Sequence, residues 1–276
     1  MSSAVNAVLS SYSGEWSQAV LQRLLASITT CAKSSNETVR SGIVEMARTV
    51  LSLQPEMHVV HSLFANELLV LPGQGKATST EHRITLYAIL AYVKPSDSVS
   101  SKLVNILPSL LSKETNEPAA AFLRVPLATH LTRVLMDGTP LPKDVSSAIV
   151  KECGSAKSLQ RRSFLLVVAE CFWLLCDAME ADLSFSIPNP AIVFGEALLP
   201  SLESNLKTTV ASPMNSSVGP IEGYITLAIV LRRGGPLSIG ECRCLPRLGA
   251  YVHPRYQQGS ANLVSGELED VLLIVR

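Results

Sequence analysis

The chain has 276 residues, of which 47% are hydrophobic, 17% charged and 5% aromatic. Lys plus Arg and Asp plus Glu both total 23, so the formal charge is zero. Affinity for nucleic acid depends largely on clustered basic residues that neutralise phosphates, and this chain has no basic excess. The length allows one large domain or two ordinary ones. Scarce aromatics and abundant Leu, Val, Ile, Ala and Ser favour helix-on-helix packing over an aromatic-rich β-sandwich.

The N-terminus lacks the basic segment and long apolar run of a signal peptide. The longest apolar stretch runs from Phe164 to Cys176 and is interrupted by Glu170, so it falls short of the roughly 18 residues that a membrane span needs. We therefore expect a cytoplasmic chain with no membrane contact and six reduced cysteines. Without secretion, the glycosylation sequons at Asn36 and Asn215 carry no information.

Apolar residues recur at helical spacing along most of the chain. Val39, Ile43, Met46, Val50 and Leu53 follow one another at steps of four and three, which predicts one apolar face on an amphipathic helix. Polar, Pro and Gly residues separate such segments, as expected at helix ends. The pattern predicts helices at about 15–33, 39–53, 57–71, 79–93, from 97 onward, 116–136, 143–153, 158–180, 191–210 and 217–232.

Two features favour a stacked array of helix pairs over a bundle. Pro108, Pro126 and Pro200 fall inside predicted helices, where an interior Pro costs about 3 kcal/mol unless the fold uses the kink. The segment 107–112 also resembles 199–204, at a spacing of about two HEAT units of roughly 40–47 residues each. The sequence therefore predicts an all-α fold, a HEAT/ARM-like α-solenoid of antiparallel helix pairs over residues 1–233.

The pattern changes after Arg233. Gly234-Gly235-Pro236 opens a segment rich in Cys, Gly and Pro, and no helical stripe returns before residues 267–275. A solenoid normally ends on a polar capping repeat, whereas this chain ends on an apolar run. We expect residues 234–276 to form an irregular or poorly ordered tail. The hypothesis that follows is a fragment of a longer protein, or an incorrectly assigned end.

Two segments partly match binding motifs. The segment Gly73–Thr78 resembles a phosphate-binding loop, but it lacks the first Gly and the Ser or Thr after the Gly-Lys pair. Cys242, Cys244 and His253 supply three possible zinc ligands, but their spacing is unusual and no fourth ligand is evident. An inter-helix loop and a metal-free tail are the preferred interpretations.

Other polar residues admit a functional and a structural interpretation. The pair His58 and His61 shares a helix face, and Glu170 and Asp177 lie seven apart on the most apolar helix, where we expect a narrow solvated stripe. Cys171 and Cys176 are expected to be core thiols, and His82 and His130 are isolated. The basic pairs 161–162 and 232–233 are expected at solvated helix ends. No nucleophile, base and oxyanion donor come together, so we predict no enzyme and no catalytic, cofactor-binding or metal-binding residue.

Three segments carry a resemblance to a known family: Lys113–Glu117 before an Ala-rich helix, Ser158–Arg162 leading into the helix of Trp173, and Gly223–Ala228. In their order, residues 1–231 resemble the N-terminal region of the large HEAT-repeat translational activator of general amino-acid control, in its fungal form. The resemblance implies a ribosome-associated scaffold. With an ABC-type partner protein, the family promotes activation of the initiation factor 2 alpha kinase in amino-acid starvation.

The resemblance transfers no catalytic residue, and the family's kinase-binding part lies beyond this segment. A different HEAT/ARM-type scaffold, such as a transport adaptor or an assembly chaperone, is the competing interpretation. A helical enzyme is a third, and it would require a polar cluster facing a closed pocket.

Overall fold

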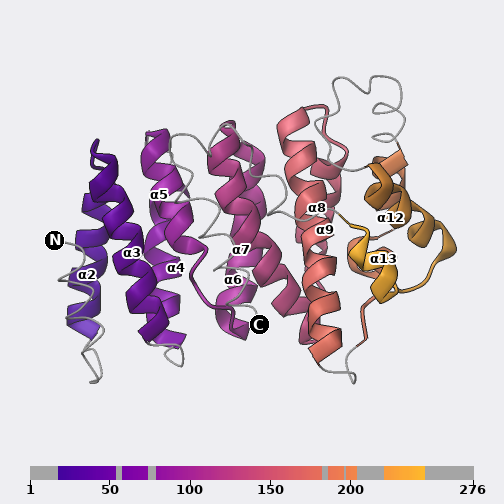
Figure 1. The fold of residues 1–276 in the computed structure, drawn as a ribbon, viewed down its shortest axis with the longest axis horizontal. Coiled ribbons are helices and arrows are strands. Elements are labelled where there is room, and N and C mark those ends of the chain that lie inside the picture. Colours follow the sequence, from indigo (N-terminus) through magenta and orange to yellow (C-terminus); the bar gives the residue numbers. More distant parts are fainter. Residues whose placement is uncertain are drawn as a thin grey trace. The chain divides into compact units, whose positions relative to one another are not determined.

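A computed structural model describes residues 18–53, 58–73, 79–181, 186–195, 197–203 and 221–245. Every regular element among these residues is a helix, which confirms the predicted all-α class (Figure 1). The chain divides into two compact units, residues 1–99 and 100–276.

The first unit contains four described helices: α2 (Gln18–Cys31), α3 (Glu37–Leu53), α4 (His58–Gly73) and α5 (Thr80–Leu90). Helix α2 packs on α3 and α4, and α5 packs on the same two helices (Figure 1). The buried side chains form one apolar core between the helices: Leu21, Leu25, Ile28, Val44, Ala47, Val50, Leu51, Val60, Phe64, Leu68, Leu86 and Ile89. Of the stripe predicted for α3, Val50 is buried, but the prediction is wrong for the residues before it, because Val39 is 40% exposed and Ile43 and Met46 are only half-buried.

Side-chain caps fix the helix starts in this unit. The Asn36 Oδ1 atom accepts a hydrogen bond of 2.9 Å from the Thr38 amide and caps α3. The Ser79 hydroxyl accepts from the His82 amide at 3.2 Å and caps α5. Beyond α5, the Lys94 amide donates to the Nδ1 atom of His61 at 3.0 Å. The two caps provide acceptors for backbone amides that the start of a helix leaves without intrahelical partners.

The second unit begins within α6 (Asp97–Lys113) and continues through α7 (Glu117–Met136), α8 (Lys143–Cys153) and α9 (Ser158–Ala181). Short helices α10 (Pro190–Phe194), α12 (Ile221–Arg233) and α13 (Ile239–Arg243) follow. The most extensive helix contact is between α7 and α9, and α8 and α13 also pack on α9. Helix α9 is therefore the central element of this unit.

Helix α9 is buried on several sides, as its nearly continuous apolar sequence predicts. Its first turns also carry a polar contact with α7. The Arg124 side chain is 3% exposed; its Nε atom donates to the Ser163 hydroxyl at 3.1 Å and its Nη2 atom lies 2.7 Å from the Glu117 carboxylate. Arg162 approaches the same carboxylate at 3.7 Å. This network fixes the register of α7 against α9, because buried charge is tolerated only where it is paired.

The prediction of one continuous helix over residues 191–210 is wrong. Helix α10 ends at Phe194, Gly195 has a φ of 80°, and a new helical segment covers residues 198–203. A left-handed φ ends a helix, and glycine adopts it without steric cost. Pro200 consequently lies in a first turn, where its missing amide hydrogen breaks no hydrogen bond. Pro108 and Pro126 do lie inside helices, α6 and α7 respectively, as predicted.

A short helix follows Arg233, in a segment where the sequence shows no helical stripe. Gly234, with a φ of 71°, ends α12, and Ser238 then opens α13. Ser238 and Glu241 form a capping box, in which the Ser238 hydroxyl accepts from the Glu241 amide and the Glu241 carboxylate accepts from the Ser238 amide. A five-residue helix has too few residues for a periodic stripe, so sequence periodicity could not reveal it. Residues 246–276 lie outside the described part.

The His82 imidazole generates a prediction about pH. Burial, together with the charge of Lys33, lowers the pKa of His82 below its ordinary value of 6.5. The unfolded chain therefore binds the proton first as the pH falls, so stability decreases below pH 6.5 and is unaffected above it. We expect the unfolding free energy of the wild-type chain to decline relative to that of a His82→Phe variant below pH 6.5, as measured by urea denaturation. Parallel pH profiles for the two chains would contradict the assignment.

Candidate functional site

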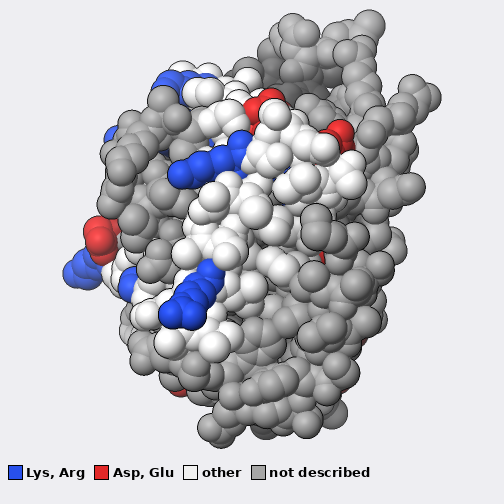
Figure 2. Space-filling model, turned by 90° about the vertical axis from the view of Figure 1, so that its left-hand side faces the viewer, with Lys and Arg blue, Asp and Glu red and all other residues white. Residues whose placement is uncertain are grey.

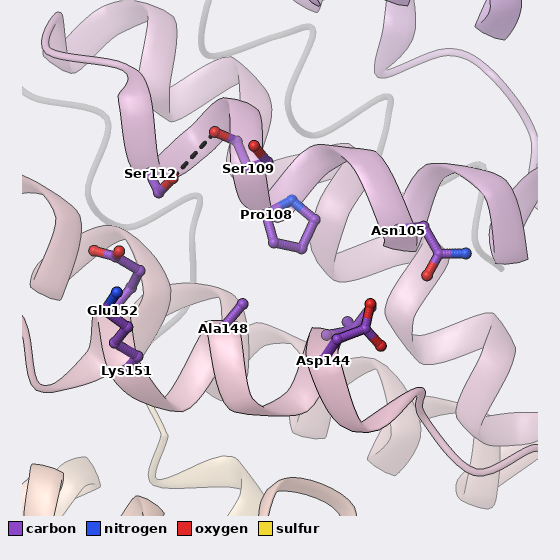
Figure 3. Close-up of a pocket in the computed structure, with 9 residues that line it drawn as sticks. Asn105, Pro108, Ser109, Ser112, Asp144, Ala148, Lys151 and Glu152 are labelled. Atoms are coloured by element: carbon purple, nitrogen blue, oxygen red, sulfur yellow. Dashed lines mark hydrogen bonds between the residues drawn. The ribbon is translucent and has the colours of Figure 1, made fainter.

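A groove runs between α6 and α8 in the second unit. It has a volume of about 290 Å³, and it is lined by Asn105, Pro108, Ser109 and Ser112 of α6 and by Asp144, Val145, Ala148, Lys151 and Glu152 of α8. Figure 3 shows the α6 residues facing those of α8 across this space. Helices α7 and α9 pack closely, whereas α6 and α8, which form the walls of the groove, do not.

The two walls of the groove offer hydrogen-bonding and charged groups around a small apolar floor. The buried Pro108 ring and Val145 form the apolar part. The Ser112 hydroxyl donates to the Ser109 carbonyl oxygen at 3.0 Å (Figure 3). Carboxylates of Asp144 and Glu152 and the ammonium group of Lys151 border the groove. An apolar centre with a polar rim is the usual composition of a protein–protein contact surface.

A second feature, which we call the arginine clasp, joins α13 to α9. It consists of Arg243 on α13 and Trp173, Asp177 and Glu180 on α9. The Arg243 guanidinium carbon lies 4.7 Å from the centroid of the Trp173 ring, in a cation–π contact. Its Nη2 atom lies 2.6 Å from the Glu180 carboxylate and 3.5 Å from that of Asp177. The hydrogen bond to Glu180 and the two negative charges raise the pKa of Arg243.

Further contacts support the clasp at both ends of α13. The Trp173 indole Nε1–H donates to the Leu245 carbonyl oxygen at 2.7 Å. Arg233, which ends α12, pairs with Glu241 at 3.1 Å. Leu237, Cys242 and Leu245 are buried beneath these polar contacts. The sequence analysis missed the clasp, although the spacing of Trp173, Asp177 and Glu180 places all three on one helix face.

Of the three possible zinc ligands of the tail, the structure describes Cys242 and Cys244. Cys242 is buried, and burial raises the pKa of its thiol to about 12, whereas Cys244 is exposed and its thiol lies 3.3 Å from the Gly240 carbonyl oxygen. His253 lies outside the described residues. Among the residues that the structure describes, no three His, Cys, Asp or Glu side chains are placed to hold a metal ion.

The other singled-out residues have mainly structural contacts. His61 accepts a backbone hydrogen bond, and the side chain of His58 lies outside the described part. The His130 Nδ1 atom lies 3.0 Å from the Ser100 hydroxyl. Cys171 is fully buried, with its thiol 3.4 Å from the Thr132 hydroxyl, and burial raises its pKa to about 12. The loop-like segment ends α4 at Gly73, and residues 74–78 are not described.

The sequence predicts Glu170 and Asp177 on a narrow solvated stripe of α9. Asp177 belongs to the arginine clasp. The prediction is wrong for Glu170, whose side chain is 1% exposed. A charge in a helix sequence does not disclose which face neighbouring helices will cover, so this burial required the tertiary structure.

The two basic pairs are engaged by acceptors of the chain itself. Arg161 donates to the Ser155 carbonyl oxygen at 3.1 Å, and Arg162 pairs with Glu117. Arg232 binds the Glu203 carboxylate through two nitrogens, at 2.9 and 2.6 Å. Figure 2 views the side of the first unit on which α2 lies, and its described Lys and Arg side chains stand apart among uncharged ones. This distribution offers no continuous basic surface among the described residues of that face.

None of the described helices is long and apolar enough to cross a membrane.

The arginine clasp predicts a local effect of Arg243→Ala. We expect faster hydrogen exchange of the α13 amides but little change in global stability, because ion pairs this exposed are screened by water. The matched control is Arg232→Ala, which removes an exposed ion pair to Glu203 outside the clasp. Hydrogen-exchange mass spectrometry compares the two variants. Equal protection of the α13 amides from exchange in both would contradict the prediction.

Comparison with known proteins identifies the family. The family model described as General control nonderepressible 1 (Gcn1) N-terminal matches residues 80–238, more than half of the chain. No curated protein and no solved structure matches the chain. The matched region contains α5 to α10 and α12, and therefore both walls of the groove and the α9 half of the arginine clasp. The chain belongs to the Gcn1 N-terminal family, as the resemblance in its sequence indicated.

Proposed function

We propose that this chain is a non-enzymatic scaffold segment of a ribosome-associated translational activator, which promotes activation of the initiation factor 2 alpha kinase in amino-acid starvation. The observation that carries the proposal is the family match over residues 80–238. In this proposal the protein acts in the cytoplasm, and its partners are the ribosome, an ABC-type partner protein and the kinase complex. A different HEAT/ARM-type adaptor, or a transport or assembly scaffold, is the alternative.

The scaffold is proposed to be a HEAT/ARM-like α-solenoid over residues 1–233, with 234–276 as a separate tail segment. The supporting observation is local. Within the first unit, α3 packs on α5 and α2 on α4; within the second, α7 packs on α9. Contact between every second helix is what stacked antiparallel pairs produce. Such arrays bind partners through extended surfaces rather than through an enclosed pocket.

We propose the α6/α8 groove as one contact surface for a protein partner. It is open to solvent, it lies inside the family-matched region, and its rim presents charges of both signs around an apolar floor. Binding at such a surface comes from a few well-packed side chains surrounded by polar contacts. A bulky substitution in the groove should therefore weaken partner binding without disturbing the helical core.

The test is sedimentation of the tagged chain from cell extract through sucrose gradients at low and moderate salt. We expect co-migration with ribosomes, reduced by Ala148→Arg, which projects a long side chain into the groove. The matched control is Ser147→Arg on the same helix, at an exposed position that does not line the groove. Migration of the wild-type chain only as a free protein would contradict ribosome association. Equal co-migration of both variants would exclude the groove as the contact surface.

A further inference from the structure

Two cysteine side chains meet where α13 packs on α9. Cys176 of α9 and Cys242 of α13 are both 0% exposed. The pKa of each thiol responds to a side-chain hydrogen bond with the other, which places the two sulfur atoms side by side. The Cys176 sulfur also lies 4.0 Å from the Ile239 carbonyl oxygen in the first turn of α13. The pair therefore joins segments far apart in the sequence, beneath the arginine clasp that also attaches α13 to α9.

The surroundings distinguish the two thiols chemically. Burial raises the pKa of both thiols, the guanidinium of Arg243 lowers both, and the charges of Glu180 and Asp177 raise that of Cys176 further. The hydrogen bond between the thiols distinguishes them, because it lowers the pKa of Cys176 and raises that of Cys242. Cys176 is thus the sulfur on which a negative charge is better stabilised, and Cys242 is the neighbour that holds the proton. The same division between an attacking thiolate and a second, resolving thiol is used by redox-active cysteine pairs.

We propose that Cys176 and Cys242 are an oxidation site, at which a peroxide converts the two thiols into a disulfide that locks α13 onto α9. The inference is independent of the proposed scaffold function. The proposed disulfide joins Cys176, inside the family match, to Cys242, which lies beyond it.

The chemistry balances with the peroxide as the only oxidant. The Cys176 thiolate attacks one peroxide oxygen, the O–O bond breaks, and the departing oxygen leaves as water after taking a proton. Cys176 is then a sulfenic acid. The Cys242 sulfur attacks the Cys176 sulfur, the S–O bond breaks, and the Cys242 proton leaves with that oxygen as a second water. Two thiols are oxidised to one disulfide, and the peroxide is reduced to two waters.

The rate of oxidation depends on how easily peroxide reaches the two sulfur atoms. Both sulfurs are covered while α13 rests on α9, so a peroxide reaches them only when α13 separates. Helix α13 has five residues and follows Gly234 and Gly235, and the arginine clasp that anchors it is partly exposed. Short elements held by few contacts open at low free-energy cost. We therefore expect the pair to oxidise more slowly than the exposed thiol of Cys244, and the disulfide to hold α13 closed afterwards.

The test treats the full chain with graded hydrogen peroxide, alkylates the remaining thiols and maps peptides by mass spectrometry without reduction. The background is Cys244→Ser, which removes the exposed neighbouring thiol and leaves the pair intact. We expect a peptide cross-link between Cys176 and Cys242 that disappears on thiol reduction and is absent in Cys176→Ser and in Cys242→Ser. Exchange of the Cys242 and Leu245 amides should slow in the cross-linked chain.

Far-ultraviolet circular dichroism confirms that each serine variant keeps its helical content before oxidation. The proposal is overturned if Cys176 and Cys242 are both still alkylated in the wild-type chain after peroxide has fully oxidised Cys244. A cross-link that joins Cys176 to Cys244 in place of Cys242 would also overturn it. So would a cross-link that leaves the exchange of α13 unchanged, because the disulfide would then not secure the helix.

Discussion

The packing of α9 against α7 is the contact on which the second unit depends. Apolar side chains cover α9 on nearly every side, and this burial supplies the non-directional part of the contact. The buried Arg124 supplies the directional part, because its guanidinium must remain near Glu117 and Ser163 if it is not to be left unpaired in an apolar layer. Once α9 is fixed in this way, its remaining flanks can accept α8 and α13.

Both candidate functional features lie on α9 or on a helix packed against it. The groove with a polar rim lies between α6 and α8, which do not pack as closely as α7 and α9 do. The flank of α9 that presents Trp173, Asp177 and Glu180 receives Arg243 from α13. Neither feature resembles an enclosed catalytic pocket. Both are surface arrangements built from side chains that a scaffold can vary without changing its core.

Membership of the Gcn1 N-terminal family gives these features a context. The scaffold role proposed above requires accessible surfaces on a stable support and segments whose attachment can change. The groove meets the first need, and α13, a short helix attached through one arginine, one indole and a buried cysteine pair, meets the second. The oxidation site proposed at Cys176 and Cys242 would make the attachment of this segment depend on thiol chemistry.

The sequence by itself determined the all-helical class and most helix positions, because apolar periodicity and the residues that end helices are local properties. It also carried the family resemblance. Only the tertiary structure showed that Gly195 interrupts a helix and that Ser238 starts one, since a φ value and a five-residue helix leave no periodic signal. It alone placed Glu170 in the interior, Arg243 on Trp173 and Cys176 beside Cys242. Those pairings join positions distant in the chain, and their partners are selected by packing rather than by neighbouring residues.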